Sequence, residues 1–206
     1  MTRSLYSKFI LGYLIFGLLG FLTIATFSSR MVREHLVQEQ ADSLYDEAHM
    51  IAATYSNMYQ GERQDAGQVS SQIRILGQYL RAEIWIINRQ GTIVMDSLGG
   101  TRVQTQVEEF DPTALGSRSY SIGDYYGFFD GNVLSVSAPI TGNYNTYGYV
   151  LIHLPMSQIS NSQSSILNIL YISAAMLFGL SLIILLVFTQ TVYLPLRKIN
   201  EGANEY

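Results

Sequence analysis

The chain has 206 residues, of which 48% are hydrophobic and only 14% are charged, and its formal net charge is −4. A soluble domain carries about 25% charged residues, so we predict that much of this chain does not face water. The absence of cysteine excludes a disulfide framework, a zinc–thiolate site and a thiol nucleophile. The negative net charge disfavours a nucleic-acid partner, which needs a basic face.

Two long segments without charge account for this composition. Residues 9–27 are almost wholly apolar, and residues 166–190 contain the uncharged run ILNILYISAAMLFGLSLIILLVF. Each run meets the roughly 18–20 residues that a helix needs to cross about 30 Å of hydrocarbon, so we predict two transmembrane helices. The alternative for the first run is a secretory signal, because Arg3 and Lys8 precede it. Its length exceeds the roughly 7–15 apolar residues of such a signal, which favours an uncleaved anchor.

Basic residues near the two ends predict the topology. Arg3 and Lys8 precede the first run, and Arg197 and Lys198 follow the second. The positive-inside rule therefore places both termini in the cytoplasm of a plasma-membrane protein. The intervening segment holds 14 acidic residues, eight arginines and no lysine. The predicted parts are 1–8 (cytoplasmic), 9–27 (transmembrane), 28–165 (extracytoplasmic), 166–190 (transmembrane) and 191–206 (cytoplasmic).

Helical periodicity marks the first part of the extracytoplasmic segment. Apolar residues spaced 3-4-3-4-3 form a continuous seam, made of Ala41, Leu44, Ala48, Ile51, Tyr55 and Met58. No proline or glycine interrupts residues 28–60, so we expect the helix to continue from the first span. The seam is either a coiled-coil interface between two copies or the face that packs on a sheet. A second helix is expected over residues 69–80.

After residue 82 the periodicity changes to that of strands. Five strands are predicted, at residues 83–88, 92–97, 118–126, 132–140 and 146–154. The first two are joined by a tight turn at residues 89–91, and residues 101–117 are expected to form a loop or a short helix. An antiparallel sheet of five strands with helices on one face is the α+β arrangement that buries both kinds of element.

Several motifs then resemble a known family. Residues 85–94, Trp-Ile-Ile-Asn-Arg-Gln-Gly-Thr-Ile-Val, resemble the strand–(Asp/Asn)-x-x-Gly–strand core of extracytoplasmic PAS-like, single-Cache sensor domains. Residues 134–140 and 147–153 look like the last two strands of that fold. Residues 193–199, Tyr-Leu-Pro-Leu-Arg-Lys-Ile, resemble the start of a HAMP linker. The whole chain resembles the N-terminal sensor half of a bacterial transmembrane sensor histidine kinase.

The resemblance implies both a fold and a function. The expected fold is α+β, with two transmembrane helices flanking an extracytoplasmic PAS-like (Cache) domain that has a long N-terminal helix and a five-stranded antiparallel sheet. The expected function is that of a homodimer in the lipid bilayer, which detects an unknown small extracellular ligand or stimulus. It would relay the signal to a cytoplasmic kinase beyond Tyr206, and from there to a response regulator.

Other classes of protein with the same extracytoplasmic domain are alternatives to the histidine kinase. These are the input region of a chemotaxis receptor or a cyclic-nucleotide synthase, and a two-span membrane-anchored binding protein without an output domain. The helical, uncapped end at Tyr206 favours a fragment of a longer protein.

No residue pattern in the chain predicts catalysis. There is no Gly-x-Ser-x-Gly elbow and no glycine-rich phosphate loop, so we expect no catalytic residue and no cofactor. The three histidines, His35, His49 and His153, are too dispersed to ligate one ion, and His153 is expected at a strand end. Acidic residues 39, 42 and 46 share one helical face, for which a solvated surface is favoured over a divalent-cation site. We expect no metal.

Ligand binding is expected where PAS-like domains bind, between the sheet and the segment that crosses it, here about residues 99–121. The resemblance implies Arg118, Tyr120 and Tyr126 as candidate ligand-binding residues, with Arg118 a partner for a carboxylate. The alternatives are a surface arginine and aromatic side chains that only pack on the sheet.

The relay of the signal is expected at the end of the second span. Pro195 lacks an amide hydrogen, so the membrane helix and a following relay helix can meet at an angle. Leu196 and Ile199 would begin the apolar seam of that relay helix. Alternatively, Pro195 merely ends the span.

Overall fold

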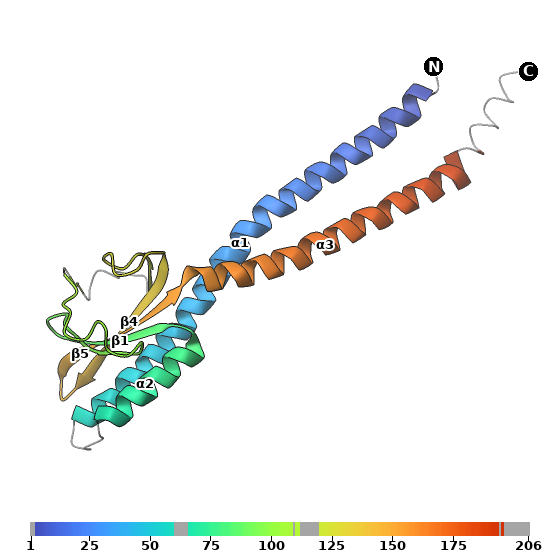
Figure 1. The fold of residues 1–206 in the computed structure, drawn as a ribbon. Coiled ribbons are helices and arrows are strands. Elements are labelled where there is room, and N and C mark those ends of the chain that lie inside the picture. Colours follow the sequence, from blue (N-terminus) through green and yellow to red (C-terminus); the bar gives the residue numbers. More distant parts are fainter. Residues whose placement is uncertain (1–2, 60–65, 109, 112–119, 194, 196–206) are drawn as a thin grey trace, which may run out of the picture. The chain divides into compact units, whose positions relative to one another are not determined.

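The structure, a computed structural model, describes residues 3–59, 66–108, 110–111, 120–193 and 195. The chain divides into two compact units, one of Met1–Val32 with Gln163–Tyr206 and one of Arg33–Ser162. Helix α1 (Arg3–Tyr59) runs without a break through parts of both units, as the sequence predicted (Figure 1). Helix α3 (Met156–Phe188) begins at the end of the second unit and is followed by a π-helical turn, Thr189–Tyr193.

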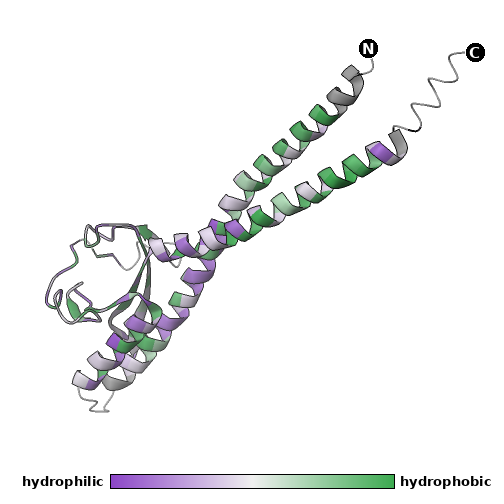
Figure 2. Cartoon of the chain, turned by 45° about the vertical axis from the view of Figure 1, so that its right-hand side comes forward, coloured by the Kyte–Doolittle hydropathy of each residue, from purple (hydrophilic) through white to green (hydrophobic). Residues whose placement is uncertain are grey.

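The first unit contains two helical segments that are long and apolar enough to cross a membrane. They lie in Ile10–Ser56 and Met156–Thr191, with mean hydropathies of 2.2 and 2.5 in their most apolar windows. Apolar side chains are exposed along these segments, for example Phe16 at 76% and Met176 at 72%, and Figure 2 shows hydrophobic colouring along both. Such a surface suits lipid and not water, and the prediction of two candidate spans is confirmed.

The two apolar helices contact each other within this unit. A Cβ on Gly17 would lie 2.0 Å from the ring of Phe178, so any larger residue there would require this ring to move. The ring of Tyr13 stacks on the same phenylalanine at 6.2 Å between centroids. At the other end of the pair, the side-chain amide of Gln163 donates to the Ser29 carbonyl at 3.0 Å.

The second unit is built on an antiparallel sheet in the order β2-β1-β5-β4-β3. Its strands are β1 (Glu83–Asn88), β2 (Ile93–Asp96), β3 (Tyr120–Gly123), β4 (Val133–Gly142) and β5 (Asn145–Pro155). Helix α2 (Ala66–Leu80) and the second part of α1 pack on one face of the sheet. The two faces have separate cores, one rich in aliphatic side chains beneath the helices and one rich in aromatic side chains beneath the loops.

The heptad-like seam of α1 faces the sheet. Ala41, Leu44 and Ala48 are at most 1% exposed, and Ile51 and Tyr55 are also buried. They belong to the same apolar cluster as the inner residues of the strands. Of the two alternatives for this seam, the structure therefore shows packing within the subunit. The side chain of Met58 lies outside the described side chains.

The hairpin between β1 and β2 explains the Asn-x-x-Gly motif. The side-chain oxygen of Asn88 accepts hydrogen bonds from the amides of Gln90 and Thr92, at 3.0 and 2.9 Å, which fixes an Asx turn. Gly91 has φ +83°, a conformation that disfavours a side chain. On β5, Gly148 lies so close to β1 that a Cβ would be 2.1 Å from the Ile87 carbonyl oxygen. The motif thus closes the turn between β1 and β2, and Gly148 allows the close approach of β5 to β1.

All five strands occur where the sequence predicted them, but the third differs in length. The prediction for it was residues 118–126, whereas the described part of β3 ends at Gly123. Tyr125 and Tyr126 have φ of +46° and +57°, which no strand allows. The aromatic residues after β3 therefore belong to a turn, Asp124–Phe129. Their spacing in the sequence does not indicate which face of the sheet each side chain lies on.

Candidate functional site

The sheet face opposite the helices carries a row of polar side chains. The cross-strand register places Ser121 of β3 beside Ser135 of β4, Ser135 beside His153 of β5, and His153 beside Glu83 of β1. Ser135, His153 and Glu83 are buried. Because a buried polar group is costly without a partner, a polar row on an inner sheet face indicates a specific role for that face.

A cavity of about 210 Å³ opens at one end of this row. Three serine hydroxyls from β3 and β4, Ser121, Ser135 and Ser137, contribute to its lining, and Leu151 of β5 also lines it. Its other walls come from the Asp124–Phe129 turn and from the segment that precedes β3, through Tyr125, Tyr126, Phe110 and Asp111. Its volume exceeds the roughly 150 Å³ of an engineered cavity that admits benzene. It is below the roughly 300 Å³ at which drug-sized pockets begin, so it suits a small molecule.

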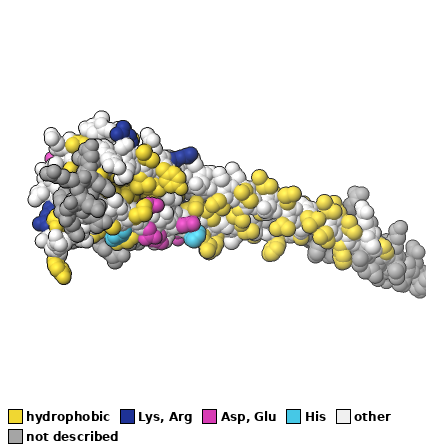
Figure 3. Space-filling model, turned by 90° about the horizontal axis from the view of Figure 1, so that it is seen from below, with side chains coloured by type: hydrophobic (Ala, Val, Ile, Leu, Met, Phe, Trp, Pro, Cys, Tyr) yellow, Lys and Arg dark blue, Asp and Glu magenta, His cyan; other side chains and the backbone are white. Residues whose placement is uncertain are grey.

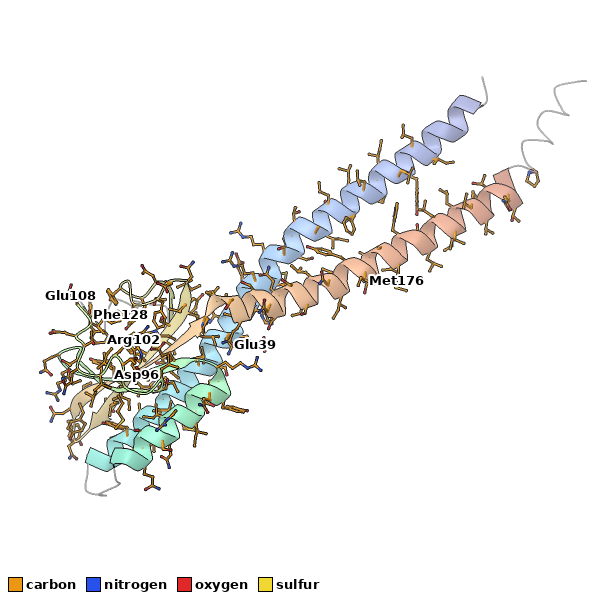
Figure 4. The ribbon with its side chains drawn as sticks, in the orientation of Figure 1. Glu39, Asp96, Arg102, Glu108, Phe128 and Met176 are labelled. Atoms are coloured by element: carbon orange, nitrogen blue, oxygen red, sulfur yellow. The ribbon has the colours of Figure 1, made fainter. Side chains whose placement is uncertain are left out.

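Glu83 lies at the other end of the polar row in an ion-paired cluster. Its carboxylate pairs with the guanidinium of Arg102 and accepts a hydrogen bond of 2.7 Å from the indole nitrogen of Trp85. Burial raises the pKa of Glu83 above its usual value and outweighs the opposing hydrogen bond from Trp85 and charge of Arg102, while nearby Asp96 adds to the rise. Figure 4 shows Arg102 and Phe128 together on this side of the sheet.

His153 lies between the ion pair and the cavity and is fully buried. Its Nδ1 is 2.8 Å from the hydroxyl oxygen of Ser135, and its ring lies 4.3 Å from both Trp85 and Tyr125 between centroids. Burial, helped by the positive charge of Arg102, lowers the pKa of His153 to about 3. The imidazole is therefore neutral at physiological pH. His153 lies near the end of β5, which continues to Pro155, as the sequence predicted.

The Ser135–His153 contact pairs a hydroxyl with a base, as nucleophilic sites do. A general base works best when its pKa is near the operating pH. A pKa of about 3 makes His153 far too weak a base to activate a hydroxyl at neutral pH. The contact is therefore a hydrogen bond between two neutral groups at the cavity wall.

The structure separates the three predicted ligand-binding residues. Tyr126 lines the cavity and is 45% exposed. Tyr120 does not point at the cavity as expected, because it packs against the aliphatic cluster beneath the helices. The alternation of β3 places Ser121 on the cavity face instead. Arg118 lies outside the described residues.

The three cavity serines were missed by sequence reasoning, which looked for charged and aromatic residues. A signal for two of them exists in β4, where Ser135 and Ser137 alternate with Leu134, Val136 and Ala138. Serine at every second position of a strand, with only apolar residues between, indicates that both faces of the strand are covered and that one of them carries hydroxyl groups.

At the predicted relay, Pro195 is helical and exposed, while Leu196 and Ile199 lie outside the described residues. The π-helical turn Thr189–Tyr193 ends just before the proline. A proline in a helix removes one amide donor and crowds the carbonyl four residues earlier, so the wider π spacing at this place has a physical cause.

The acidic face of α1 shows no metal-binding arrangement. Among the described residues no group of three or more His, Asp or Glu side chains lies close enough together to hold an ion. Glu39, Asp42 and Asp46 are exposed on this helix, and Figure 3 shows acidic and histidine side chains together on one face of the molecule.

Comparison with known proteins shows likeness in structure but not in sequence. No protein-family model matches the chain, and no curated protein matches it either. The sensor domain of the V. cholerae histidine kinase DctB matches with a TM-score of 0.50 and 13% identity, over 69% of this chain and 59% of that structure.

Two further solved structures match with lower TM-scores. The E. coli DcuS sensor domain gives 0.42 at 17% identity, over 62% of this chain and 98% of that one. The ligand-binding domain of the Pseudomonas aeruginosa PAO1 amino-acid chemoreceptor PctC, in complex with GABA, gives 0.41 at 12% identity, over 63% of each chain.

These findings define the class of fold. The Arg33–Ser162 unit, with its long first helix and five-stranded antiparallel sheet, has the PAS-like (Cache) fold of histidine-kinase sensor domains. Two candidate membrane helices flank it. The fold expected from the sequence is confirmed. Because the chain spans only 59% of the DctB structure that it matches, the likeness extends to the fold alone.

Proposed function

We propose that the chain is the sensor region of a membrane signalling protein and that its cavity binds a small extracellular molecule. The observation that carries this proposal is the hydroxyl-lined cavity on the loop-covered face of the sheet. A concave, mainly apolar site with a few converging polar groups is the usual form of a small-molecule site. Serine hydroxyls both donate and accept hydrogen bonds, so they suit a polar ligand.

The ligand would contact the turn and the sheet together. Tyr126 and Tyr125 offer aromatic surface, and Ser121, Ser135 and Ser137 offer hydroxyls. Arg118 stays a proposed partner for a carboxylate on the ligand. Tyr120 is not part of this proposal, because its side chain packs on the opposite face of the sheet.

We further propose that both termini are cytoplasmic and that the signal passes along α3. The basic residues beside the spans support this orientation. β5 ends at Pro155 and α3 begins at Met156, so no linker separates the sheet from the second span. Pro195, Leu196 and Ile199 would begin the cytoplasmic relay.

For the output we propose a histidine kinase that acts as a homodimer and phosphorylates a response regulator. The HAMP-like sequence after the second span and the fold match to a histidine-kinase sensor domain support this proposal. Because the seam of α1 is buried within the subunit, such a dimer would use another surface.

The test is a thermal-shift screen of the full chain in nanodiscs against small amino acids, amines and carboxylates. Ser137→Leu is the matched variant, because it adds apolar bulk to the cavity wall. We expect at least one compound to raise the melting temperature of the wild type and to leave that of Ser137→Leu unchanged. A compound that stabilises both proteins equally binds elsewhere, and a screen without any such compound contradicts the proposal.

A further inference from the structure

The turn between β3 and β4 has an unfavourable backbone conformation. Tyr125, Tyr126 and Gly127 have φ of +46°, +57° and +75° in succession. The left-handed region is sterically disfavoured for bulky side chains, and it persists only where the surroundings hold it. The two tyrosines are also walls of the cavity. Whatever fixes this turn therefore fixes the shape of the proposed ligand site.

One guanidinium group connects this turn to the sheet. Arg102, in the loop after β2, pairs with Glu83 of β1 and donates from Nη2 to the Phe128 carbonyl at 3.1 Å. Its guanidinium carbon lies 4.9 Å from the ring centroid of Phe129 and 5.3 Å from that of Trp85. The ring of Phe129 in turn stacks on Trp85, at 5.6 Å and an interplanar angle of 11°. The same side chain thus contacts the strand, the turn and the aromatic core between them.

We propose that Arg102 is a positioning residue that latches the Asp124–Phe129 turn in the shape that forms the cavity wall. Only arginine suits these contacts, because its planar fork donates in two directions while its face lies on aromatic rings. Glu83 is buried at 9% exposure, so its charge needs the guanidinium as a partner. Without Arg102, the turn loses a hydrogen bond and a stacking partner, and the tyrosines are free to leave the left-handed conformation.

The consequence for sensing rests on the proposed function. A molecule in the cavity that contacts Tyr125 and Tyr126 would have different affinities for the latched and released turns, and so would shift the balance between them. The latch itself needs no ligand and is testable without one.

Trp85 provides the probe, because it is the only tryptophan of the chain and lies against the turn. We would measure its emission and its quenching by acrylamide in full-length protein in nanodiscs. The variants are Arg102→Ala, Arg102→Lys and Glu83→Gln, and Arg74→Ala at an exposed site on α2 is the matched control. Far-UV circular dichroism reports whether each variant is folded.

We expect folded Arg102→Ala to show red-shifted emission and quenching that rises several-fold. Arg102→Lys should not rescue it, since a single ammonium group cannot replace the fork. Arg74→Ala should match the wild type. If Arg102→Ala does not fold, the same changes in Arg102→Lys and Glu83→Gln support the latch. If every folded variant at positions 102 and 83 has the same emission and the same quenching as the wild type, the proposed latch is wrong. A ligand screen that fails while quenching rises would refute the proposed function and leave the latch intact.

Discussion

At the scale of single residues, His153 links the polar row of the sheet to the stability of the domain. In the folded chain its pKa is lowered to about 3 from the ordinary 6.5. Between these two pH values the unfolded chain binds a proton that the folded chain does not, so the free energy of unfolding falls as the pH falls. One proton gives a slope of up to about 1.4 kcal/mol per pH unit.

We predict that His153→Asn removes this slope between pH 6.5 and about 3, because asparagine retains a polar partner for Ser135 but does not titrate. Urea unfolding in detergent, followed by the emission of Trp85, measures the slope at each pH. The same substitution at the exposed His35 is the matched control. Equal slopes in the wild type and His153→Asn would show that His153 is not held neutral by the fold.

At the scale of elements, the apolar seam of α1 packs this helix on the sheet of its own subunit. Leu44 is 1% exposed within the aliphatic cluster, and Met50 on the same helix is 55% exposed. Truncating a buried leucine to alanine costs about 2–5 kcal/mol, because it removes apolar contacts and leaves a cavity. We predict a loss in this range for Leu44→Ala and a much smaller one for Met50→Ala, measured by urea unfolding. A small loss at Leu44 would place the seam outside the subunit core.

The contact between the two apolar helices gives a second prediction at this scale. The rings of Phe21 and Tyr171 lie 6.0 Å apart, and the chain has no cysteine of its own. Cysteines at these two positions should be joined within one chain by a bifunctional thiol reagent in membranes, because the side chains that they replace lie near each other. Gly17→Leu should reduce this crosslinking, because any side chain there collides with Phe178, while Gly20→Leu, which meets no neighbour, should not. If both leucine variants crosslink like the parent, the helices do not meet at Gly17.

The elements were predictable from the sequence because each leaves a local pattern. The uncharged runs, the 3-4 seam and the Asn88-x-x-Gly91 turn are all contained within short stretches of chain. The candidate site was less predictable, since Glu83 and Arg102 meet only after β1 and the loop beyond β2 are brought together. The face of Tyr120 was misjudged because strand alternation fixes which residues share a face but not which of the two faces meets the cavity.

At the scale of the whole molecule, we propose that the cavity of the Arg33–Ser162 unit receives the signal and that α3 carries it to the output. The polar row, the latched turn and the absence of a linker between β5 and α3 are the features that support it. Ligand binding alone would not establish this account, because a membrane-anchored binding protein would bind as well. The activity of the cytoplasmic output domain has to change when the ligand binds.

The most direct measurement joins the chain, through its natural sequence to Tyr206, to the cytoplasmic part of a histidine kinase. Autophosphorylation is then followed in membrane vesicles with the compound that stabilises the wild type in the thermal-shift screen. We predict that the compound changes the rate of phosphorylation, that Ser137→Leu loses this response, and that Pro195→Ala alters the basal rate or the response. An equal response in the wild type and Ser137→Leu, or none in either, would contradict this account.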